Sequence, residues 1–179
     1  AIGASMTSFA ATGWAEEDGT WVYYNRDGER ATDQWKKSGN NWYWLDSDGE
    51  MAIDQLIEDG DNYYYVDING VMAANQWVAI DNEDAGQDNE PDHYWYYFQA
   101  NGKALKNGDN AKVALKTING KKYAFDDEGK MLYGWVSEDN AERVDDTDGD
   151  GFKEGTYYFG GEDDGAMTVG WLQMDITYD

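Results

Sequence analysis

The strongest constraint on the fold is a repeat of 21 residues that starts near the beginning of the sequence. A bulky apolar residue recurs at this interval, a ring follows seven residues later, and a glycine comes seven residues after the ring. The apolar residues are Trp14, Trp35, Leu56 and Trp77, the rings are Trp21, Trp42 and Tyr63, and the glycines are Gly28, Gly49 and Gly70. Such a period indicates that each copy is one small structural unit.

Altered copies continue through the rest of the chain. The segments WYYFQANG (95–102), KYAFDDEG (122–129) and TYYFGGEDDG (156–165) keep the aromatic run and the glycine. We predict six copies and a terminal half-copy, over 13–33, 34–54, 55–75, 76–106, 107–133, 134–169 and 170–179. Residues 1–12 lack the charged and apolar regions of a complete signal peptide, so we expect a linker or a truncated chain end.

Each copy has the pattern of a β-hairpin. A short strand begins at the Gly-Trp or Gln-Trp pair, turns through EEDG, KSGN or EDGD, and returns through the aromatic run. Glycine, aspartate and asparagine at the turns supply the backbone conformations that tight turns need. Hairpins this small cannot bury a face alone, so they must stack on their neighbours. We therefore predict an all-β, elongated solenoid of stacked hairpins.

Alternation along the aromatic strand separates its four positions onto two faces. The second and fourth positions are apolar or aromatic in every copy, which predicts that this face forms the core. They are Val22, Tyr43, Tyr64, Tyr96, Tyr123 and Tyr157, and Tyr24, Leu45, Val66, Phe98, Phe125 and Phe159. The first and third positions accept Lys122, Thr156 and Ala124. On that face we expect partly exposed rings, including Trp42 and Trp44, that form either a ligand groove or a cover for the next hairpin.

Composition excludes several classes of function. The chain has 37 acidic and 13 basic side chains, a formal net charge of -24, so it repels nucleic acid and anionic membranes. This charge serves either solubility or the recruitment of cations. The chain has no cysteine and no run of 18 apolar residues, so we expect no disulfide and no membrane-spanning helix.

The segments GWAEEDGTWVYYNRDGERATDQW and QWKKSGNNWYWLDSDGEMAIDQL resemble the cell-wall-binding (choline-binding) repeat. The resemblance covers about residues 13–179 and is strongest over 13–77. It implies a hairpin solenoid on secreted or surface-attached proteins of the Gram-positive cell wall, often beside a separate catalytic or adhesive domain. It also implies a partner that is a wall polymer, either a choline-bearing teichoic acid or a glucan.

In the choline-binding members, the ligand lies between consecutive hairpins in a cage of aromatic rings. Carried over to this sequence, one cage consists of Trp14 and Trp21 with Trp44 or Tyr43. A second consists of Trp35 and Trp42 with Tyr65 or Tyr64, and Trp77 and Trp95 are further candidates. Met51 and Met72 are candidates for the cage floors. A quaternary ammonium group is attracted to ring faces by about 0.5–2 kcal/mol per contact.

Some copies depart from the pattern of the family. Leu56 replaces the Gly-Trp ring of copy three, and Leu115 and Lys122 replace both rings of copy five. Trp77 and Trp95 are 18 residues apart instead of 7, because copy four contains an insertion. We therefore expect at most two or three working sites.

The insertion in copy six contains a second motif. Asp146, Asp148, Asp150 and Gly151 match the D-x-D-x-D-G start of a calcium-binding loop, and Glu154 holds its ninth position. Tyr157 stands where such loops have a bidentate glutamate. The segment is thus either a calcium site, the one cofactor that the sequence suggests, or a solvated acidic loop.

The residues offer no arrangement for catalysis. A single histidine, no cysteine and few serines leave no pairing of nucleophile and base. We therefore predict a non-catalytic binding module. Three functions remain open: a binder of choline-like cations, a glucan binder that uses the same rings for stacking, and a structural spacer. The oligomeric state is open as well.

Overall fold

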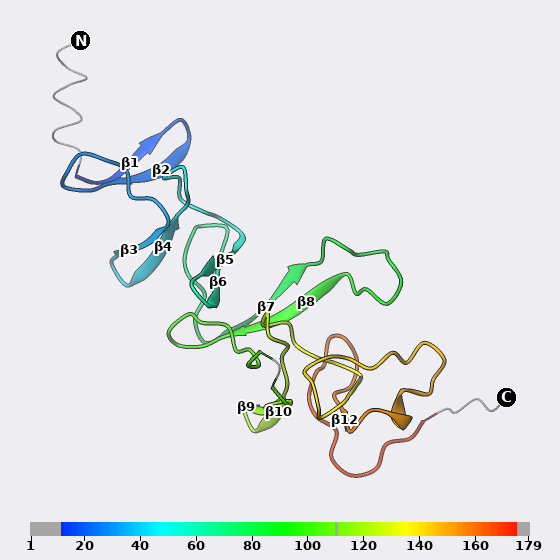
Figure 1. Ribbon diagram of the computed structural model, residues 1–179. Coiled ribbons are helices and arrows are strands. Elements are labelled where there is room, and N and C mark those ends of the chain that lie inside the picture. The colour runs from blue at the N-terminus through cyan, green and yellow to red at the C-terminus, as the bar shows by residue number, and fades with distance from the viewer. Residues whose placement is uncertain (1–11, 110, 175–179) are drawn as a thin grey trace, which may run out of the picture. The chain divides into compact units, whose positions relative to one another are not determined.

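The computed structural model describes residues 12–109 and 111–174, which form antiparallel β-hairpins and one short 3-10 helix (Figure 1). The chain divides into two compact units, residues 1–74 and 75–179, and each is described by itself. The hairpins of the first unit are β1 (Gly13–Glu17) with β2 (Thr20–Tyr24), β3 (Gln34–Ser38) with β4 (Asn41–Leu45), and β5 (Gln55–Asp59) with β6 (Asn62–Val66). Those of the second are β7 (Gln76–Asp81) with β8 (His93–Phe98), β9 (Lys116–Ile118) with β10 (Lys121–Tyr123), and β11 (Trp135–Val136) with β12 (Tyr157–Tyr158).

The short turns inside the hairpins follow the predicted chemistry, whereas long loops join β7 to β8 and β11 to β12. Between β1 and β2, Asp18 and Gly19 have φ angles of 53° and 78°, as a two-residue hairpin loop requires. In copies two, three and five, the turn after the aromatic strand depends on an aspartate. After β4, the Asp46 carboxylate accepts the backbone N–H groups of Asp48 and Glu50, both at 2.9 Å. Asp67 and Asp126 do the same in later copies.

Consecutive hairpins within a unit are joined by a repeated backbone hydrogen bond. In the first unit, the N–H of Met51 donates to the carbonyl of Trp21 at 2.8 Å, and that of Met72 donates to Trp42 at 2.9 Å. In the second unit, Met131 bonds Trp95 in the same way. The turn of one copy is thereby fixed on the aromatic strand of the preceding copy. The predictions of an all-β fold and of stacked hairpins are confirmed.

The core of each unit is centred on the fourth position of the aromatic strands. Leu45, Val66, Phe98 and Phe159 are fully buried there, as expected, and only Tyr24 is half-buried at this position. A cluster in the first unit combines Val66 with Trp44, Ala52 and Ile57, and Trp35 and Tyr64 pack against it.

Trp44 corrects one expectation about the two faces. We expected it to be partly exposed, but only 8% of its surface is accessible. The register of β3 and β4 places Trp44 directly opposite Trp35, and their ring centroids lie 5.2 Å apart. The pair fills the space above Ile57, so the third position is part of the core in this copy.

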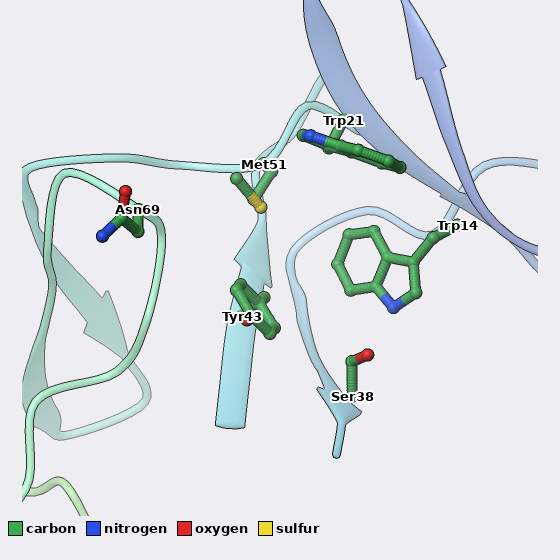
Figure 2. Close-up of a pocket in the computed structure, with 6 residues that line it drawn as sticks. All are labelled: Trp14, Trp21, Ser38, Tyr43, Met51 and Asn69. Atoms are coloured by element: carbon green, nitrogen blue, oxygen red, sulfur yellow. The ribbon is translucent and has the colours of Figure 1, made fainter. Parts of the chain in front are cut away.

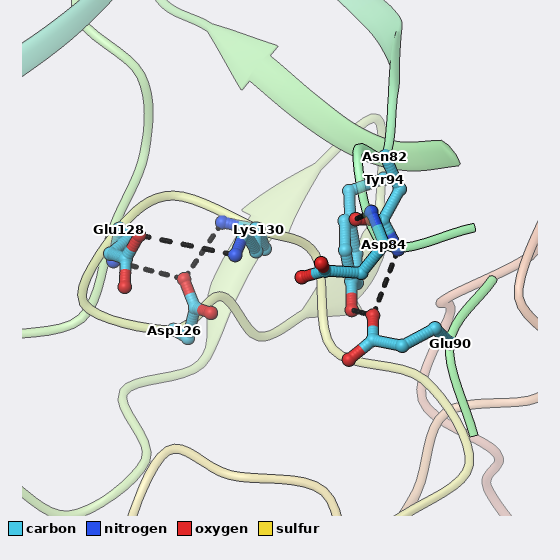
Figure 3. A network of polar contacts seen from close by, with 7 residues as sticks. All are labelled: Asn82, Asp84, Glu90, Tyr94, Asp126, Glu128 and Lys130. Carbon is cyan, nitrogen blue, oxygen red and sulfur yellow. Dashed lines mark hydrogen bonds and ion pairs between the residues drawn. The ribbon is translucent and has the colours of Figure 1, made fainter. Parts of the chain in front are cut away.

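The insertion of copy four extends the loop between β7 and β8 and is held by a polar network (Figure 3). Glu90 accepts hydrogen bonds from the Tyr94 hydroxyl at 2.7 Å and from Asn82 Nδ2 at 2.8 Å. These donors, Tyr94 first, lower the pKa of Glu90. Burial, with Glu90 beside the ring, raises the pKa of Tyr94 to about 12. The insertion therefore folds back on the strand that follows it.

The predicted linker over 1–12, apart from Thr12, and the last five residues of the predicted half-copy over 170–179 lie outside the described residues. Within the described ranges, no helix has the length and apolar character needed to cross a membrane.

Candidate ligand-binding cavities

A cavity of about 300 Å³ opens between the first two hairpins of the first unit (Figure 2). Three consecutive copies supply its walls, which consist of Trp14, Trp21, Ser38, Tyr43, Met51 and Asn69. The stacking hydrogen bond from Met51 to Trp21 explains why the thioether lies beside that ring. The backbone contact that joins the hairpins thus also builds the cavity.

The rings of this cavity differ in how firmly they are held. The indole of Trp14 lies edge-on against Tyr43, with ring centroids 5.4 Å apart, and also contacts Tyr23 of its own hairpin. Trp21 is 42% exposed and covers the cavity from one side, as Figure 2 shows. Trp14 and Tyr43 therefore form a fixed wall, whereas Trp21 presents a ring face that is open to solvent.

One polar atom in this wall is distinctive. The indole nitrogen of Trp14 is buried and has no hydrogen-bond partner among the described residues. The equivalent nitrogen of Trp35 donates to Asp59 at 3.2 Å. Ser38 holds the position in its copy that Asp59 holds in the next, but it is not a partner of Trp14. The wall of the first cavity is consequently less acidic than the surroundings of Trp35 in the second predicted cage.

The sequence offered Trp44 or Tyr43 as the third ring of this cage, and the structure brings Tyr43 to it. Trp44 is committed to the core beside Trp35. Tyr43 was also expected in the core, because it holds the second position of its strand. It is half-buried instead, and its ring contacts Trp14 of the preceding hairpin.

The second predicted set shows the same ring geometry. Trp35 and Tyr64 have ring centroids 5.1 Å apart, and Trp42 is 39% exposed. Tyr65, the other ring offered for this cage, donates its hydroxyl to Asp54 at 2.5 Å. Burial and this hydrogen bond raise the pKa of Tyr65 to about 12. Tyr64 therefore occupies the place that Tyr43 has in the first cavity.

A second cavity, of about 320 Å³, lies within the second unit. It is lined by Trp77, Trp95, Tyr123, Met131, Asp163 and Asp164. The centroids of Trp77 and Tyr123 are 4.9 Å apart, and the N–H of Met131 bonds the carbonyl of Trp95. Trp77 and Trp95 thus line one cavity although 18 residues separate them, because the inserted residues extend the loop away from the strand ends.

Two acidic side chains distinguish the second cavity from the first. Asp163 accepts a hydrogen bond from Trp95 Nε1 at 2.9 Å, and its Oδ1 lies 2.7 Å from His93 Nε2. The donors Trp95 and, after it, His93 lower the pKa of Asp163. A carboxylate therefore stands at the edge of the ring of Trp95. In the first cavity, the uncharged Asn69 holds the repeat position of Asp164.

Sequence reasoning missed four residues of the second cavity: Tyr123, Met131, Asp163 and Asp164. Copy five was discounted because Leu115 and Lys122 replace its own rings. Its Tyr123 nevertheless completes the cavity that copy four begins. Tyr123 could have been predicted from its repeat position, because it occupies the same place in its copy as Tyr43 does in copy two.

The acidic loop of copy six has a compact local structure. The short helix η1 (Gly151–Lys153) follows it, and Asp146 Oδ1 accepts the N–H of Gly151 at 2.8 Å. Among the described residues, no group of three or more carboxylate, histidine or cysteine side chains is arranged to hold a metal ion. Calcium binding by Asp146, Asp148, Asp150 and Glu154 stays a prediction.

Comparison with protein families gives two matches. The family model described as "Choline-binding repeat" matches residues 11–52 and 31–77. The model described as "Putative cell wall binding repeat" matches residues 94–104. No sequence among the curated proteins matches the chain.

Three solved structures from Streptococcus pneumoniae are similar to the chain. Choline binding protein F is 26% identical, with a TM-score of 0.57 over 92% of this chain and 47% of that protein. CbpJ is 25% identical, with a TM-score of 0.54 over 88% of this chain and 42% of that protein. The choline binding domain of Spr1274 is 32% identical, with a TM-score of 0.39 over 52% of this chain and 94% of that domain. The chain spans less than half the length of choline binding protein F and of CbpJ.

Proposed function

Because the chain belongs to the choline-binding repeat family, we propose that it is a non-catalytic module that binds choline-like ammonium groups of a cell-wall polymer. The module acts on a secreted or surface-attached protein at a Gram-positive cell wall. Its polymer is a choline-bearing teichoic acid, and the ligand groups enter the aromatic cavities between consecutive hairpins. Attachment of the larger protein to the wall is the result.

The observation that carries this proposal is the first cavity. Its three rings, Trp14, Trp21 and Tyr43, come from two hairpins and surround one space. A quaternary ammonium group has no N–H to donate, so ring faces are its best partners in a protein. The thioether of Met51 adds a polarizable apolar contact suited to the methyl groups.

The charge of the chain favours the same ligand. The net charge of -24 produces a negative potential that raises the local concentration of cations. None of the side chains that line the first cavity is cationic. A cationic ligand therefore meets attraction both at long range and at contact.

The polar groups of the cavities support a binding role rather than a chemical one. His93, the sole histidine, bonds Asp163 at the rim of the second cavity. The rings and the thioether contribute no group that could transfer a proton at neutral pH. We therefore assign any catalytic activity of the larger protein to another domain.

Calorimetric titration with choline chloride tests the proposal, with dextran as the second ligand and sodium chloride as the blank. The informative variant is Trp21→Ala, because this ring is 42% exposed and contributes little to the core. The matched control is Trp171→Ala, which removes a fully exposed indole that lines neither cavity. We expect choline binding, a loss of affinity at the first cavity in Trp21→Ala of about 2- to 30-fold, and no change in the control.

Other outcomes would point elsewhere. A binding heat with dextran but not with choline would contradict choline binding. It would indicate instead that the module binds a glucan and that the same rings stack on its sugars. No response to either ligand would leave the module as a spacer. Equal choline affinity in the wild type and in Trp21→Ala would remove the first cavity as the site.

A further inference from the structure

The two cavities share their aromatic walls but differ in charge. Each contains two indoles, one tyrosine of the following copy and a methionine. The polar side chains of the first cavity are Ser38 and Asn69, which are uncharged. Those of the second are Asp163 and Asp164, which are anionic. The same kind of ring cage is therefore combined with two different electrostatic surroundings.

The position of Asp163 is set by the residues of the cage itself. Its Oδ1 accepts the indole N–H of Trp95 at 2.9 Å and contacts His93 Nε2 at 2.7 Å. His93 and Trp95 project from the same face of β8, and their rings meet edge-on with centroids 5.8 Å apart. The carboxylate is thus fixed beside a cage ring and is part of the cavity's rim.

The turn that carries these two aspartates is fixed as well. Gly165, which directly follows Asp164, packs so closely on Met131 that a Cβ at this glycine would overlap the thioether. The N–H of Met167 bonds the carbonyl of Lys122 at 2.8 Å and joins the same turn to β10. Both carboxylates therefore stay at the mouth of the second cavity.

We propose that the second cavity selects ammonium cations that carry no adjacent anionic group, whereas the first cavity accepts an ammonium group with or without one. This inference rests on the proposed function, since it concerns the specificity of the same kind of cage. A phosphate next to the ammonium group would lie close to Asp163 and Asp164 and be repelled. At the first cavity it would meet Ser38 and Asn69, whose hydroxyl and amide groups can donate hydrogen bonds to it.

The two cavities can be followed separately in the intact chain. Met51 lines the first cavity and Met131 lines the second, so methyl-labelled methionine gives one NMR signal for each. The signals are assigned with Met51→Leu and Met131→Leu. Choline and phosphocholine are then titrated in turn, because they share the ammonium group and only phosphocholine carries a phosphate. The field of the whole chain acts on both cavities, so the comparison between the two signals isolates the local carboxylates.

At each cavity, the measured quantity is the ratio of the Kd for phosphocholine to the Kd for choline. We expect this ratio to be about fivefold or more larger at the second cavity, measured by the Met131 signal, than at the first cavity, measured by the Met51 signal. The double variant Asp163→Asn, Asp164→Asn should bring the two ratios together. Asparagine keeps an oxygen that can accept the Trp95 hydrogen bond, so the variant removes charge with little change in shape. Added salt should reduce the difference in the wild type, because these groups are solvent-exposed.

Three results would overturn the inference. Equal ratios at Met51 and Met131 in the wild type would show that the carboxylates do not discriminate. A Met131 signal that responds to neither ligand, while Met51 responds, would remove the second cavity and leave the proposed function standing. Silence of both signals would contradict the proposed function itself.

Discussion

The indole of Trp14 lies edge-on against the phenol ring of Tyr43, with ring centroids 5.4 Å apart and ring planes at 73°. The two residues belong to consecutive hairpins, so the contact forms only when the hairpins stack. Neither copy can therefore build the first cavity alone. A ligand held between these rings bridges the joint between hairpins, which links binding to the stability of the first unit.

This relationship predicts a specific effect of substitution at Tyr43. Tyr43→Leu keeps an apolar side chain but removes a ring face, so choline affinity at the first cavity should fall by about 2- to 30-fold. Tyr43→Phe keeps the ring and should bind choline within about threefold of the wild type. The Met51 methyl signal measures both affinities. A Phe variant as weak as the Leu variant would mean that the hydroxyl, not the ring, holds the ligand.

The neighbouring tryptophans Trp42 and Trp44 should respond differently to truncation. Trp44 is 8% exposed and packs on Trp35 and Ile57, so Trp44→Ala should lower the free energy of unfolding of the first unit by about 3–5 kcal/mol. Trp42 is 39% exposed, and Trp42→Ala should lower it by about 1 kcal/mol or less. Hydrogen exchange at the Ala52 amide, which bonds the Trp44 carbonyl, reports on this unit.

The measurement separates a core role from a binding role for each ring. If the Ala52 amide lost comparable protection against hydrogen exchange in Trp44→Ala and in Trp42→Ala, the assignment of Trp44 to the core would be wrong. Because Trp42 belongs to the Trp35 and Tyr64 set, its truncation should still weaken choline binding although the fold persists.

These two residues also show what sequence could and could not predict. The 21-residue period, the glycines and the turn aspartates were enough to predict hairpins and the buried fourth positions such as Leu45 and Val66. Alternation separates Trp42 from Tyr43, but it does not say which face is covered. Trp44 is buried because the register places it against Trp35 and the next copy adds Ile57. That information depends on how one hairpin is rotated onto the next.

The second cavity was harder to predict for a related reason. Its residues come from three copies, and Asp163 lies 86 positions after Trp77 in the sequence. Insertions of different length in copies four and six break the fixed spacing that located the first cavity. The hydrogen bond from Met131 to Trp95 still places the methionine beside the aromatic strand, as in the first cavity, although the sequence spacing differs. Repeat position was therefore a better guide than distance along the chain.

The turn aspartate of copy five predicts a dependence of stability on pH. Burial raises the pKa of Asp126 to about 6, although the N–H groups of Lys130 and Glu128 oppose this shift (Figure 3). The folded state then holds its proton more firmly than the unfolded state, where the pKa is near 3.8. The stability that protonated Asp126 contributes is complete below pH 4 and is lost as the pH rises through 6.

Asp126→Asn tests this dependence. The amide oxygen can accept the same two backbone N–H groups, and the neutral side chain avoids the burial of charge. We expect the variant to be more stable than the wild type by about 1–2 kcal/mol at pH 7, and the two to converge near pH 4. Urea unfolding at several pH values measures the difference. A difference that does not change with pH would show that the pKa of Asp126 is the same in the folded and the unfolded protein.

Gly70 predicts that the first cavity depends on a residue that does not line it. Its φ angle is 82°, and a Cβ there would lie 2.8 Å from the Met51 methyl carbon and 3.3 Å from the Ala52 carbonyl oxygen. Gly60 has a φ angle of 62° and open space around its Cβ position. Alanine at either site should cost about 1–2 kcal/mol for the left-handed backbone conformation. Only Gly70→Ala must also displace Met51.

We therefore expect Gly70→Ala to shift the Met51 methyl signal and to weaken choline binding at the first cavity several-fold, whereas Gly60→Ala changes neither. Equal choline affinities in the two variants would mean that the Met51 thioether contributes nothing to the site.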